Sequence, residues 1–231
     1  FFVDGVRDDG QYFRDLYNLE RVEALKGPNA MIFGRGGAGG VVNRVTKEAG
    51  FAPLHEFALQ GGSFGGKRFS TNLDRPVGDK LAFRLNSVFE NSGSFRKYDD
   101  LERYGISPVL RYSPWALTKV TLRYEHFVDD RTADRGIPSF QGRPAGVPIS
   151  TFYGDPESSS VRARVNLGSA AVEHQAGGVN IRNRTHLGAY DRRYQNYVPG
   201  AVTADLTGVA LSAYNNNTGR LNVFNQTDLT Y

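Results

Sequence analysis

The sequence of 231 residues predicts a mainly β protein whose strands form an antiparallel meander. Three observations predict this class. Most segments after residue 53 alternate apolar and polar residues with a period of two, as strands with two different faces do. The connections between these segments are alternately tight and long. No stretch approaches the roughly 18 consecutive apolar residues of a transmembrane helix.

The composition excludes several kinds of site. Cysteine is absent, which removes disulfides, zinc-thiolate sites and cysteine nucleophiles. The balance of 28 Lys and Arg against 24 Asp and Glu is mildly basic and interspersed, so it suits an anionic ligand or surface but not nucleic acid. The four histidines show no metal-ligand spacing: His55, His126, His174 and His186.

The first 52 residues differ from the rest and indicate a compact α+β unit. Short apolar runs there are mixed with Gly, Pro and charged residues. Residues 31–33 and 41–45 fit strands on either side of a glycine-rich stretch, and residues 16–25 fit a helix or a strand.

The glycine-rich stretch GRGGAGG, residues 34–40, matches the spacing of a dinucleotide-binding turn. That turn requires a helix after it, but Val41, Val42 and Val45 are β-branched and favour a strand. We therefore expect a tight turn between two strands, where glycine allows positive φ and close backbone packing. The structural glycines are Gly27, Gly34, Gly36, Gly39 and Gly40.

Eight strands are expected after this unit, at residues 54–61, 67–75, 81–91, 103–113, 118–128, 161–174, 179–190 and 221–231. Every second connection is tight (PVGDK, PWAL, QAGG), and the others lengthen to residues 129–160 and 191–220. Antiparallel strands place alternate connections at opposite ends of a sheet. This sorting of short turns and long loops is typical of an outer-membrane barrel.

The unit before the strands predicts a wide barrel. A closed barrel of eight strands holds only side chains, so a folded unit of about 50 residues would not fit inside. The known wide architecture with a plug has 22 strands. The predicted fold is therefore part of a 22-stranded antiparallel transmembrane β-barrel with an N-terminal α+β plug, truncated at both ends.

Residues 1–47 resemble a known family closely. FFVDGVRDDGQYFRDLYNLERVEALKGPNAMIFGRGGAGGVVNRVTK resembles the second half of the plug domain of TonB-dependent outer-membrane siderophore receptors. The shared pattern is a V-D-G-V-R strand, an apex loop, L-E-R-V-E-x-L-K-G-P and F-G-R-G-x-x-G-G-V-x-N-x-V-T-K. GGSFGG and RPVGDKLAFRLNSVFENSGSFR are similar to the first barrel strands of that family. The resemblance implies the C-terminal half of a plug in residues 1–52 and the first eight or so barrel strands in residues 53–231.

The resemblance also implies a function. Such a receptor lies in the outer membrane of a Gram-negative bacterium and imports a ferric siderophore, here of catecholate type. TonB, with ExbB and ExbD, drives the import through an N-terminal segment that this sequence does not contain. Iron travels inside its chelator, so no cofactor or resident metal is expected, and the other partners are outer-membrane lipid and lipopolysaccharide, without nucleic acid.

Two alternatives stay open from the sequence, and an enzyme is not expected. One keeps TonB-dependent import but changes the cargo to a corrinoid or an oligosaccharide. The other is a soluble β-rich glycan-binding module. The string GGSFG, residues 61–65, matches G-x-S-x-G, but the following KRFSTNLDR alternates as a strand where a serine hydrolase needs a helix.

The resemblance assigns candidate ligand residues. The apex loop that faces the siderophore corresponds to Gln11, Tyr12, Phe13 and Arg14, with Arg7 as a further candidate. Aromatic rings stack on planar chelating groups, and arginine donates charge-assisted hydrogen bonds to an anion. Packing within the plug is the alternative role. Further candidates in the long loops are Tyr98, Arg131, Arg135, Tyr153, Arg192, Arg193 and Tyr194.

A second set of residues resembles the charges that tie plug to barrel wall in this family. These are Arg21, Glu23 and Lys26 in ERVEALKG. Breaking such a pair leaves a poorly solvated charge if the pair is buried. An exposed pair, the alternative reading, is worth less than about 1 kcal/mol.

Overall fold

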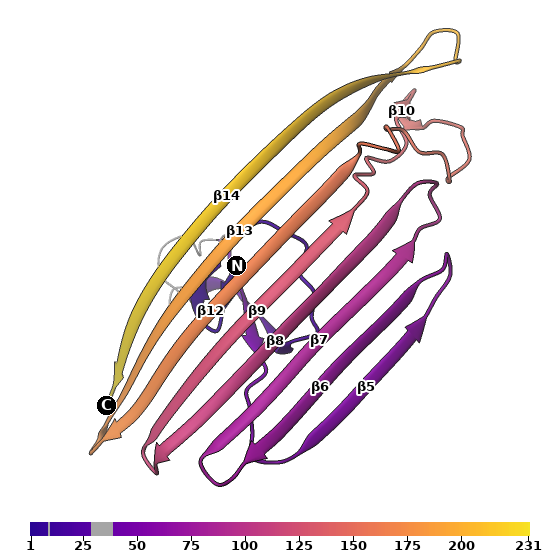
Figure 1. Ribbon diagram of the computed structural model, residues 1–231. Coiled ribbons are helices and arrows are strands. Elements are labelled where there is room, and N and C mark those ends of the chain that lie inside the picture. The colour runs from indigo at the N-terminus through magenta and orange to yellow at the C-terminus, as the bar shows by residue number, and fades with distance from the viewer. Residues whose placement is uncertain (9, 29–38) are drawn as a thin grey trace.

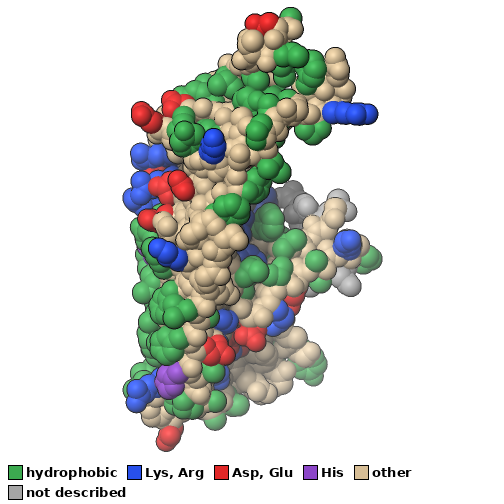
Figure 2. All heavy atoms as spheres, turned by 90° about the vertical axis from the view of Figure 1, so that its right-hand side faces the viewer, with side chains coloured by type: hydrophobic (Ala, Val, Ile, Leu, Met, Phe, Trp, Pro, Cys, Tyr) green, Lys and Arg blue, Asp and Glu red, His purple; other side chains and the backbone are tan. Residues whose placement is uncertain are grey.

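The computed structural model describes residues 1–8, 10–28 and 39–231, and two sheets dominate it. The N-terminal strands form a four-stranded sheet, here called the small sheet, in the order β2-β1-β4-β3. The other long strands form an eight-stranded sheet, here called the large sheet, in the order β14-β13-β12-β9-β8-β7-β6-β5. The small sheet lies on the concave side of the large sheet (Figures 1 and 2).

The small sheet follows from short local signals. Its strands are β1 (Phe2–Val3), β2 (Val6–Arg7), β3 (Leu19–Leu25) and β4 (Val41–Thr46). Asp4 and Gly5 form the two-residue turn between β1 and β2, with φ of 49° and 82°. A hairpin turn of this type requires a positive φ at both residues, which Asp-Gly sequences favour. The Asp4 carboxylate accepts bonds from the backbone N and the hydroxyl of Thr46 (2.9 and 2.7 Å), which fixes this hairpin to β4.

Every strand of the large sheet pairs antiparallel with its neighbours. The strands are β5 (Leu54–Gly61), β6 (Lys67–Val77), β7 (Leu81–Gly93), β8 (Asp100–Trp115), β9 (Thr118–Arg131), β12 (Ser160–Ala176), β13 (Val179–Val202) and β14 (Val209–Thr230). A short hairpin of β10 (Ser139–Phe140) and β11 (Arg143–Pro144) lies in the long connection between β9 and β12.

The two faces of the large sheet differ in character. The outer face, directed away from the small sheet, exposes apolar and aromatic side chains, and Figure 2 shows hydrophobic side chains along this side. Examples are Phe57, Phe69, Phe83, Phe89, Tyr104, Leu122, Leu187 and Val223. The inner face meets the small sheet through a core of Tyr17, Val88, Phe127, Val165, Leu167 and Tyr190, with Tyr12 packed against it. No helix in the described ranges has the length and apolarity needed to cross a bilayer.

The predicted strands are confirmed, but one predicted loop is wrong. Six strands begin or end close to the predicted residue at the tight turns 78–80, 116–117 and 177–178, and β5 has the predicted bounds 54–61. The segment 191–220, predicted as a loop, instead continues β13 to Val202 and begins β14 at Val209, leaving only the turn 203–208. The segment 16–25 contains a strand, β3, because it pairs with β4.

The predicted structural glycines differ in whether their backbone requires glycine. Gly40 has φ of +113°, and a Cβ there would lie 2.9 Å from the Leu25 carbonyl oxygen, so both predicted reasons for glycine hold. Gly27 has φ of +64°, whereas Gly39 has neither a positive φ nor a neighbour within 4 Å. Gly34, Gly36 and the predicted strand 31–33 lie outside the described residues.

Candidate functional site

The apex segment, residues 8 and 10–18, lies between β2 and β3 in the sequence and against the inner face of the large sheet. Asp8 at its start is fully buried and accepts hydrogen bonds from Arg14 (3.0 Å, from Nη2) and from the Tyr190 hydroxyl of β13 (2.8 Å). The Arg14 guanidinium also lies over the Tyr12 ring at 4.3 Å. These contacts hold the segment in a fold that turns Arg14 inward.

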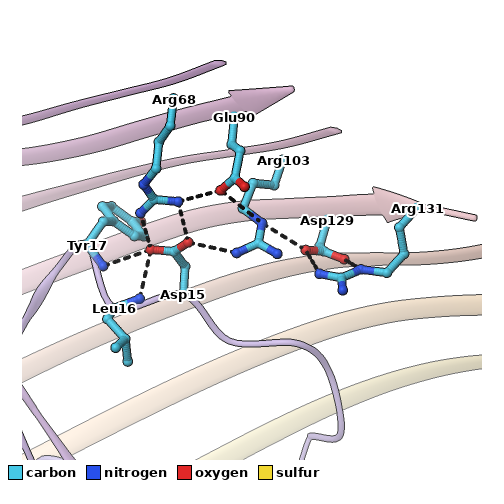
Figure 3. Close-up of polar contacts among 8 residues, drawn as sticks. All are labelled: Asp15, Leu16, Tyr17, Arg68, Glu90, Arg103, Asp129 and Arg131. Atoms are coloured by element: carbon cyan, nitrogen blue, oxygen red, sulfur yellow. Dashed lines mark hydrogen bonds and ion pairs between the residues drawn. The ribbon is translucent and has the colours of Figure 1, made fainter. Parts of the chain in front are cut away.

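Asp15 fixes the far end of the apex segment to the large sheet (Figure 3). Its carboxylate accepts the backbone N–H groups of Leu16 and Tyr17 (2.7 and 3.0 Å). It also accepts hydrogen bonds of 2.8 Å from two guanidinium groups, Arg68 of β6 and Arg103 of β8. One buried carboxylate therefore joins the segment to two strands.

The same ion-pair network extends along the inner face in both directions (Figure 3). Arg68 pairs with Glu90 at 2.6 Å, and Arg103 pairs with Asp129 at 3.2 Å. Asp129 is almost fully buried and also accepts two bonds from Arg131, at 2.7 and 2.6 Å. Because each carboxylate is shared by neighbouring arginines, the network connects the apex segment to the end of β9.

The protonation states of the apex segment follow from these contacts. Burial alone would raise the pKa of Asp15, but hydrogen bonds from Arg68 and Arg103 outweigh it and hold the pKa well below its usual value. Burial, with the nearby Asp8 charge, raises the pKa of the Tyr12 phenol far above its usual value. Asp15 is therefore a carboxylate and Tyr12 a neutral phenol at neutral pH.

A cleft of about 550 Å³, here called the apex pocket, opens between the apex segment and the long-loop ends of β9, β12 and β13. It is lined by Gln11, Tyr12, Phe13, Asp99, Asp129, Arg131, Thr132, Ala133, Asp134, Arg135, Val161, Ala163, Arg192 and Tyr194. Its volume lies within the range of small-molecule sites in proteins.

Arginines and aromatic rings meet in pairs on the walls of the apex pocket. The Arg131 guanidinium lies 3.8 Å from the centre of the half-exposed Phe13 ring. Arg192 lies 5.5 Å from the Tyr194 ring centre and donates to the Gln11 carbonyl at 3.1 Å. Such pairs present flat surfaces and cationic edges to the same space.

The charges of the apex pocket leave a positive surplus for a ligand. Asp129 is neutralised by Arg131 and Arg103, and Asp134 by Arg96 at 2.5 Å. Arg135 donates to the buried Asn196 side chain at 2.7 Å. Among the described residues, neither Arg135 nor Arg192 forms an ion pair within 4 Å, and the lining carboxylate of Asp99 forms none either. The pocket therefore holds two cations and one carboxylate without an ion-pair partner. The arrangement suits an anionic ligand with aromatic groups.

The structure brings together seven of the sequence-predicted ligand residues, which all line the apex pocket: Gln11, Tyr12, Phe13, Arg131, Arg135, Arg192 and Tyr194. Arg14 lies outside it because Asp8 holds its guanidinium. Tyr98 packs on Phe152 with ring centres 6.1 Å apart and is not among the lining residues. The remaining three, Arg7, Tyr153 and Arg193, are not among the lining residues.

The residues predicted to tie plug to wall contact each other or their own sheet. Arg21 pairs with Glu23 at 2.8 Å on the same strand, and Glu23 accepts a bond from Asn43 of β4. The exposed Lys26 shows no ion pair with a described residue. The observed ties between the sheets come from other residues, above all Asp15, because the apex segment and not β3 lies against the described strands.

The sequence analysis did not predict the ion-pair network, although the cross-strand pairs within it could be found from the sequence. Arg68 is the cross-strand partner of Glu90, and Arg103 is that of Asp129. Pairing the strands outward from the tight turns would place these opposite charges side by side. Asp15 binds Arg68 and Arg103, which lie 53 and 88 residues away in the sequence, and no local sequence pattern predicts such contacts.

Within the described ranges, no group of three or more His, Asp or Glu side chains is arranged to hold a metal ion.

Comparison with known proteins shows which family the chain resembles in sequence and in structure. Residues 1–41 match the model of the TonB-dependent Receptor Plug Domain. The chain is 32% identical over 214 residues to the probable TonB-dependent receptor BfrD of Bordetella pertussis, covering 89% of this chain and 29% of that protein. It is 27% identical over 224 residues to the catecholate siderophore receptor Fiu of Escherichia coli K12, covering 90% of this chain and 29% of that protein. The chain thus spans about three tenths of the length of these relatives.

A solved structure shows the same arrangement of strands. The crystal structure of the open form of the ferric-catecholate import receptor Fiu from E. coli K12 matches with a TM-score of 0.87 and 26% identity. The match covers 99% of this chain and 38% of that one, so it includes both the small sheet and the large sheet. On its sequence and its fold together, this chain belongs to the family of TonB-dependent receptors.

Proposed function

We propose that a receptor containing this chain imports ferric siderophores of catecholate type. The observation that carries the proposal is the apex pocket, where three aromatic residues of the predicted site meet two arginines that have no carboxylate partner among the described residues. Tyr12, Phe13 and Tyr194 offer rings that stack on catechol groups, and Arg135 and Arg192 attract the negative charge of the ferric complex. The name of the relative Fiu points to the same ligand class.

The proposed location is the outer membrane of a Gram-negative bacterium. Support comes from the outer face of the large sheet, where exposed Phe, Leu, Val and Tyr side chains suit contact with lipid. In this location the outer surface contacts membrane lipid and lipopolysaccharide. Energy reaches the small sheet from TonB, with ExbB and ExbD, and the match of residues 1–41 to a plug domain supports this coupling.

The proposed reaction is transport without chemical change of the ligand. Iron enters inside its chelator, so the receptor needs neither a resident metal nor a cofactor, and no enzymatic step. Import of a corrinoid or an oligosaccharide is the competing proposal within the same family. It predicts tight binding of an uncharged ligand, to which the charges of Arg135 and Arg192 would contribute little.

Ligand binding tests the proposal directly. Calorimetric titration of the full receptor with a ferric catecholate should give submicromolar affinity. Phe13→Ala removes an exposed ring of the pocket and should weaken binding about tenfold. The double variant Tyr12→Ala with Phe13→Ala should weaken it further.

Tyr98→Ala is the matched control, since it removes a ring that packs outside the pocket and should leave the affinity unchanged. Equal affinity of wild type and both pocket variants would remove the apex pocket as the site. Tighter binding of a corrinoid or an oligosaccharide than of any ferric catecholate would overturn the ligand class. Iron uptake that persists in cells lacking TonB would overturn the coupling.

A further inference from the structure

One carboxylate on the wall of the apex pocket differs from the others. Of the three aspartates that line the pocket, Asp129 and Asp134 each pair with an arginine at 2.6 Å or less. The carboxylate of Asp99 forms neither an ion pair nor a hydrogen bond with a described residue, and its side chain is half-buried. A lone negative charge repels an anionic ligand unless the ligand brings a positive group close to it.

Backbone contacts on both sides fix the position of Asp99. This residue lies in the connection of β7 to β8, and Thr132 directly after β9 spans it. The Thr132 hydroxyl donates to the Tyr98 carbonyl at 2.7 Å and accepts the backbone N–H of Asp100 at 3.2 Å. The backbone N of Thr132 donates to the Asp100 carbonyl at 2.9 Å. Because Thr132 lines the apex pocket, these bonds hold Asp99 at the same wall.

The backbone directly before Asp99 has an uncommon conformation. Tyr98 has φ of 62°, in the left-handed region that residues other than glycine rarely adopt. Such a conformation persists only where the surrounding structure dictates it, and it is concentrated at ligand-binding and active sites. The bond from Thr132 to the Tyr98 carbonyl holds this bend, and the next side chain along the chain is that of Asp99.

The two arginines without an ion-pair partner among the described residues lie on the opposite side of the pocket. Arg192 belongs to β13, and Arg135 donates to Asn196 of the same strand at 2.7 Å. Asp99 directly precedes β8, and β9 and β12 separate β8 from β13 in the large sheet (Figure 1). Three interstrand steps of ~4.8 Å place β8 and β13 roughly 14 Å apart. The pocket is therefore polarised, with positive charge toward β13 and negative charge toward β8.

This polarity specifies how charge is distributed on a ligand. The catecholate oxygens around ferric iron carry the negative charge, so the ferric centre suits the β13 side of the pocket. On the β8 side the ligand needs a positive group that donates hydrogen bonds, and an ammonium group supplies both. A bound metal ion is not the counter-charge, because the described residues contain no group of three His, Asp or Glu side chains arranged to hold one.

We propose that Asp99 binds an ammonium group of the ligand, so that the apex pocket prefers ferric catecholates that carry an amine. This inference rests on the proposed import of ferric catecholates, and it names the part of the ligand by which the pocket distinguishes between them. A chelate without an amine still binds through Arg135, Arg192 and the aromatic rings. It binds less tightly, because it leaves the Asp99 charge without a partner beside an anion.

Calorimetric titration of the full receptor with two matched chelates tests the inference. They are the ferric complexes of dihydroxybenzoyl-lysine amide and dihydroxybenzoyl-norleucine amide, which have similar shape and differ in the ammonium group. The wild type should bind the lysine chelate about tenfold more tightly, as expected for a hydrogen-bonded charge pair. Asp99→Asn keeps the shape of the side chain and removes its charge. In this variant the affinity for the lysine chelate should fall and that for the norleucine chelate should rise.

Opposite changes for two chelates in one variant cannot result from a misfolded pocket. Asp100→Asn is the matched control, since it removes the same charge from the exposed neighbouring residue outside the pocket lining and should keep the preference. Three outcomes would overturn the inference. They are equal affinity of the wild type for both chelates, an unchanged preference in Asp99→Asn, and an equal gain for both chelates in that variant, which would show that Asp99 only repels anions.

The same titrations keep this inference apart from the import proposal. In each of the three outcomes, tight binding of the norleucine chelate by the wild type leaves import of ferric catecholates standing. A wild-type receptor that binds neither chelate overturns both proposals.

Discussion

At the scale of single residues, Asp15 shows how one carboxylate can join two sheets. Leu16 and Tyr17 fix its orientation through their backbone N–H groups, and Arg68 and Arg103 approach from two strands. Asparagine has nearly the same shape, but it replaces an acceptor oxygen by an NH₂ group and removes the charge. Both guanidinium groups would then lie in a partly buried space without their common anion.

Asp15→Asn should therefore loosen the apex segment at a cost of about 3–5 kcal/mol, as for other broken buried ion pairs. Hydrogen exchange of the full receptor should show faster exchange in residues 10–28 and little change in β5 to β9. The exposed Asp79→Asn in the turn between β6 and β7 is the matched control. Equal exchange in both variants would show that Asp15 does not hold the segment.

Gly40 makes a second prediction at this scale. Its φ of +113° disfavours any side chain, and a Cβ at this position would lie 2.9 Å from the Leu25 carbonyl oxygen, which leaves no room for alanine. Gly40→Ala should destabilise the pairing of β3 with β4 by about 1–3 kcal/mol. Gly39→Ala, where the neighbouring space is open, should have little effect on the same hydrogen-exchange measurement. A larger effect at Gly39 would contradict the assignment.

At the scale of elements, the shape of the apex pocket depends on contacts that hold the long connection between β9 and β12 in place. Arg96, in the connection from β7 to β8, is buried and binds Asp134 at 2.5 Å and the carbonyls of Ile149 and Thr151 at 2.8 Å. It thereby holds both ends of the long connection between β9 and β12. Asp134 lines the apex pocket, so a residue outside the pocket sets the shape of its wall.

Arg96→Ala should release residues 132–159 and weaken ferric catecholate binding about tenfold while the strands stay intact. Limited proteolysis should cut the long connection faster in this variant. Lys97→Ala, which removes an exposed neighbouring side chain, should resemble the wild type in both measurements. Arg96→Lys should recover only part of the affinity, because lysine cannot reach three acceptors in the same geometry. Wild-type affinity for ferric catecholate in Arg96→Ala would show that Arg96 does not shape the apex pocket.

The sequence predicts strands well wherever one face of the strand is apolar. Toward the long loops of β13 and β14, neither face is apolar, so the stretch around Tyr214 to Asn217 lacks the alternation that would distinguish it from a loop. The direction of each face is also hidden, because alternation alone cannot tell that Val165 points inward while Leu187 points outward. The apex residues follow from the family resemblance, but contacts such as Asp15 with Arg103 depend on the folded chain.

At the scale of the whole molecule, charges are complementary between the two sheets. The segment that carries the small sheet contributes carboxylates, and the large sheet contributes cations. Asp15 pairs with Arg68 and Arg103, while Glu48 pairs with Lys119 at 3.6 Å and with Arg123 at 3.2 Å. In the ion pairs between these two parts of the described chain, the carboxylates therefore come from the N-terminal segment.

This complementarity predicts release of the small sheet by acid. Burial raises the pKa of Asp15 and of Glu48, but the facing cations outweigh it and lower both values. Their contribution is complete above the unfolded pKa of about 4 and is lost as the pH falls through the lower folded values. Hydrogen exchange in residues 10–28 should therefore accelerate below about pH 4. Asp15→Asn should show a smaller acceleration, and an identical acid profile in that variant would contradict the explanation.

The hairpin of β13 and β14 extends beyond the neighbouring strands at the long-loop end of the large sheet (Figure 1). From Arg193 to Val202, β13 continues for roughly 30 Å at ~3.4 Å per residue. At its tip, hydrogen bonds from Thr203 and Thr207 lower the pKa of Asp205 to about 2 and hold the turn in one shape. In the proposed outer-membrane location this ordered tip would be open to an antibody, which makes residues 203–208 a well-defined epitope at a distance from the apex pocket.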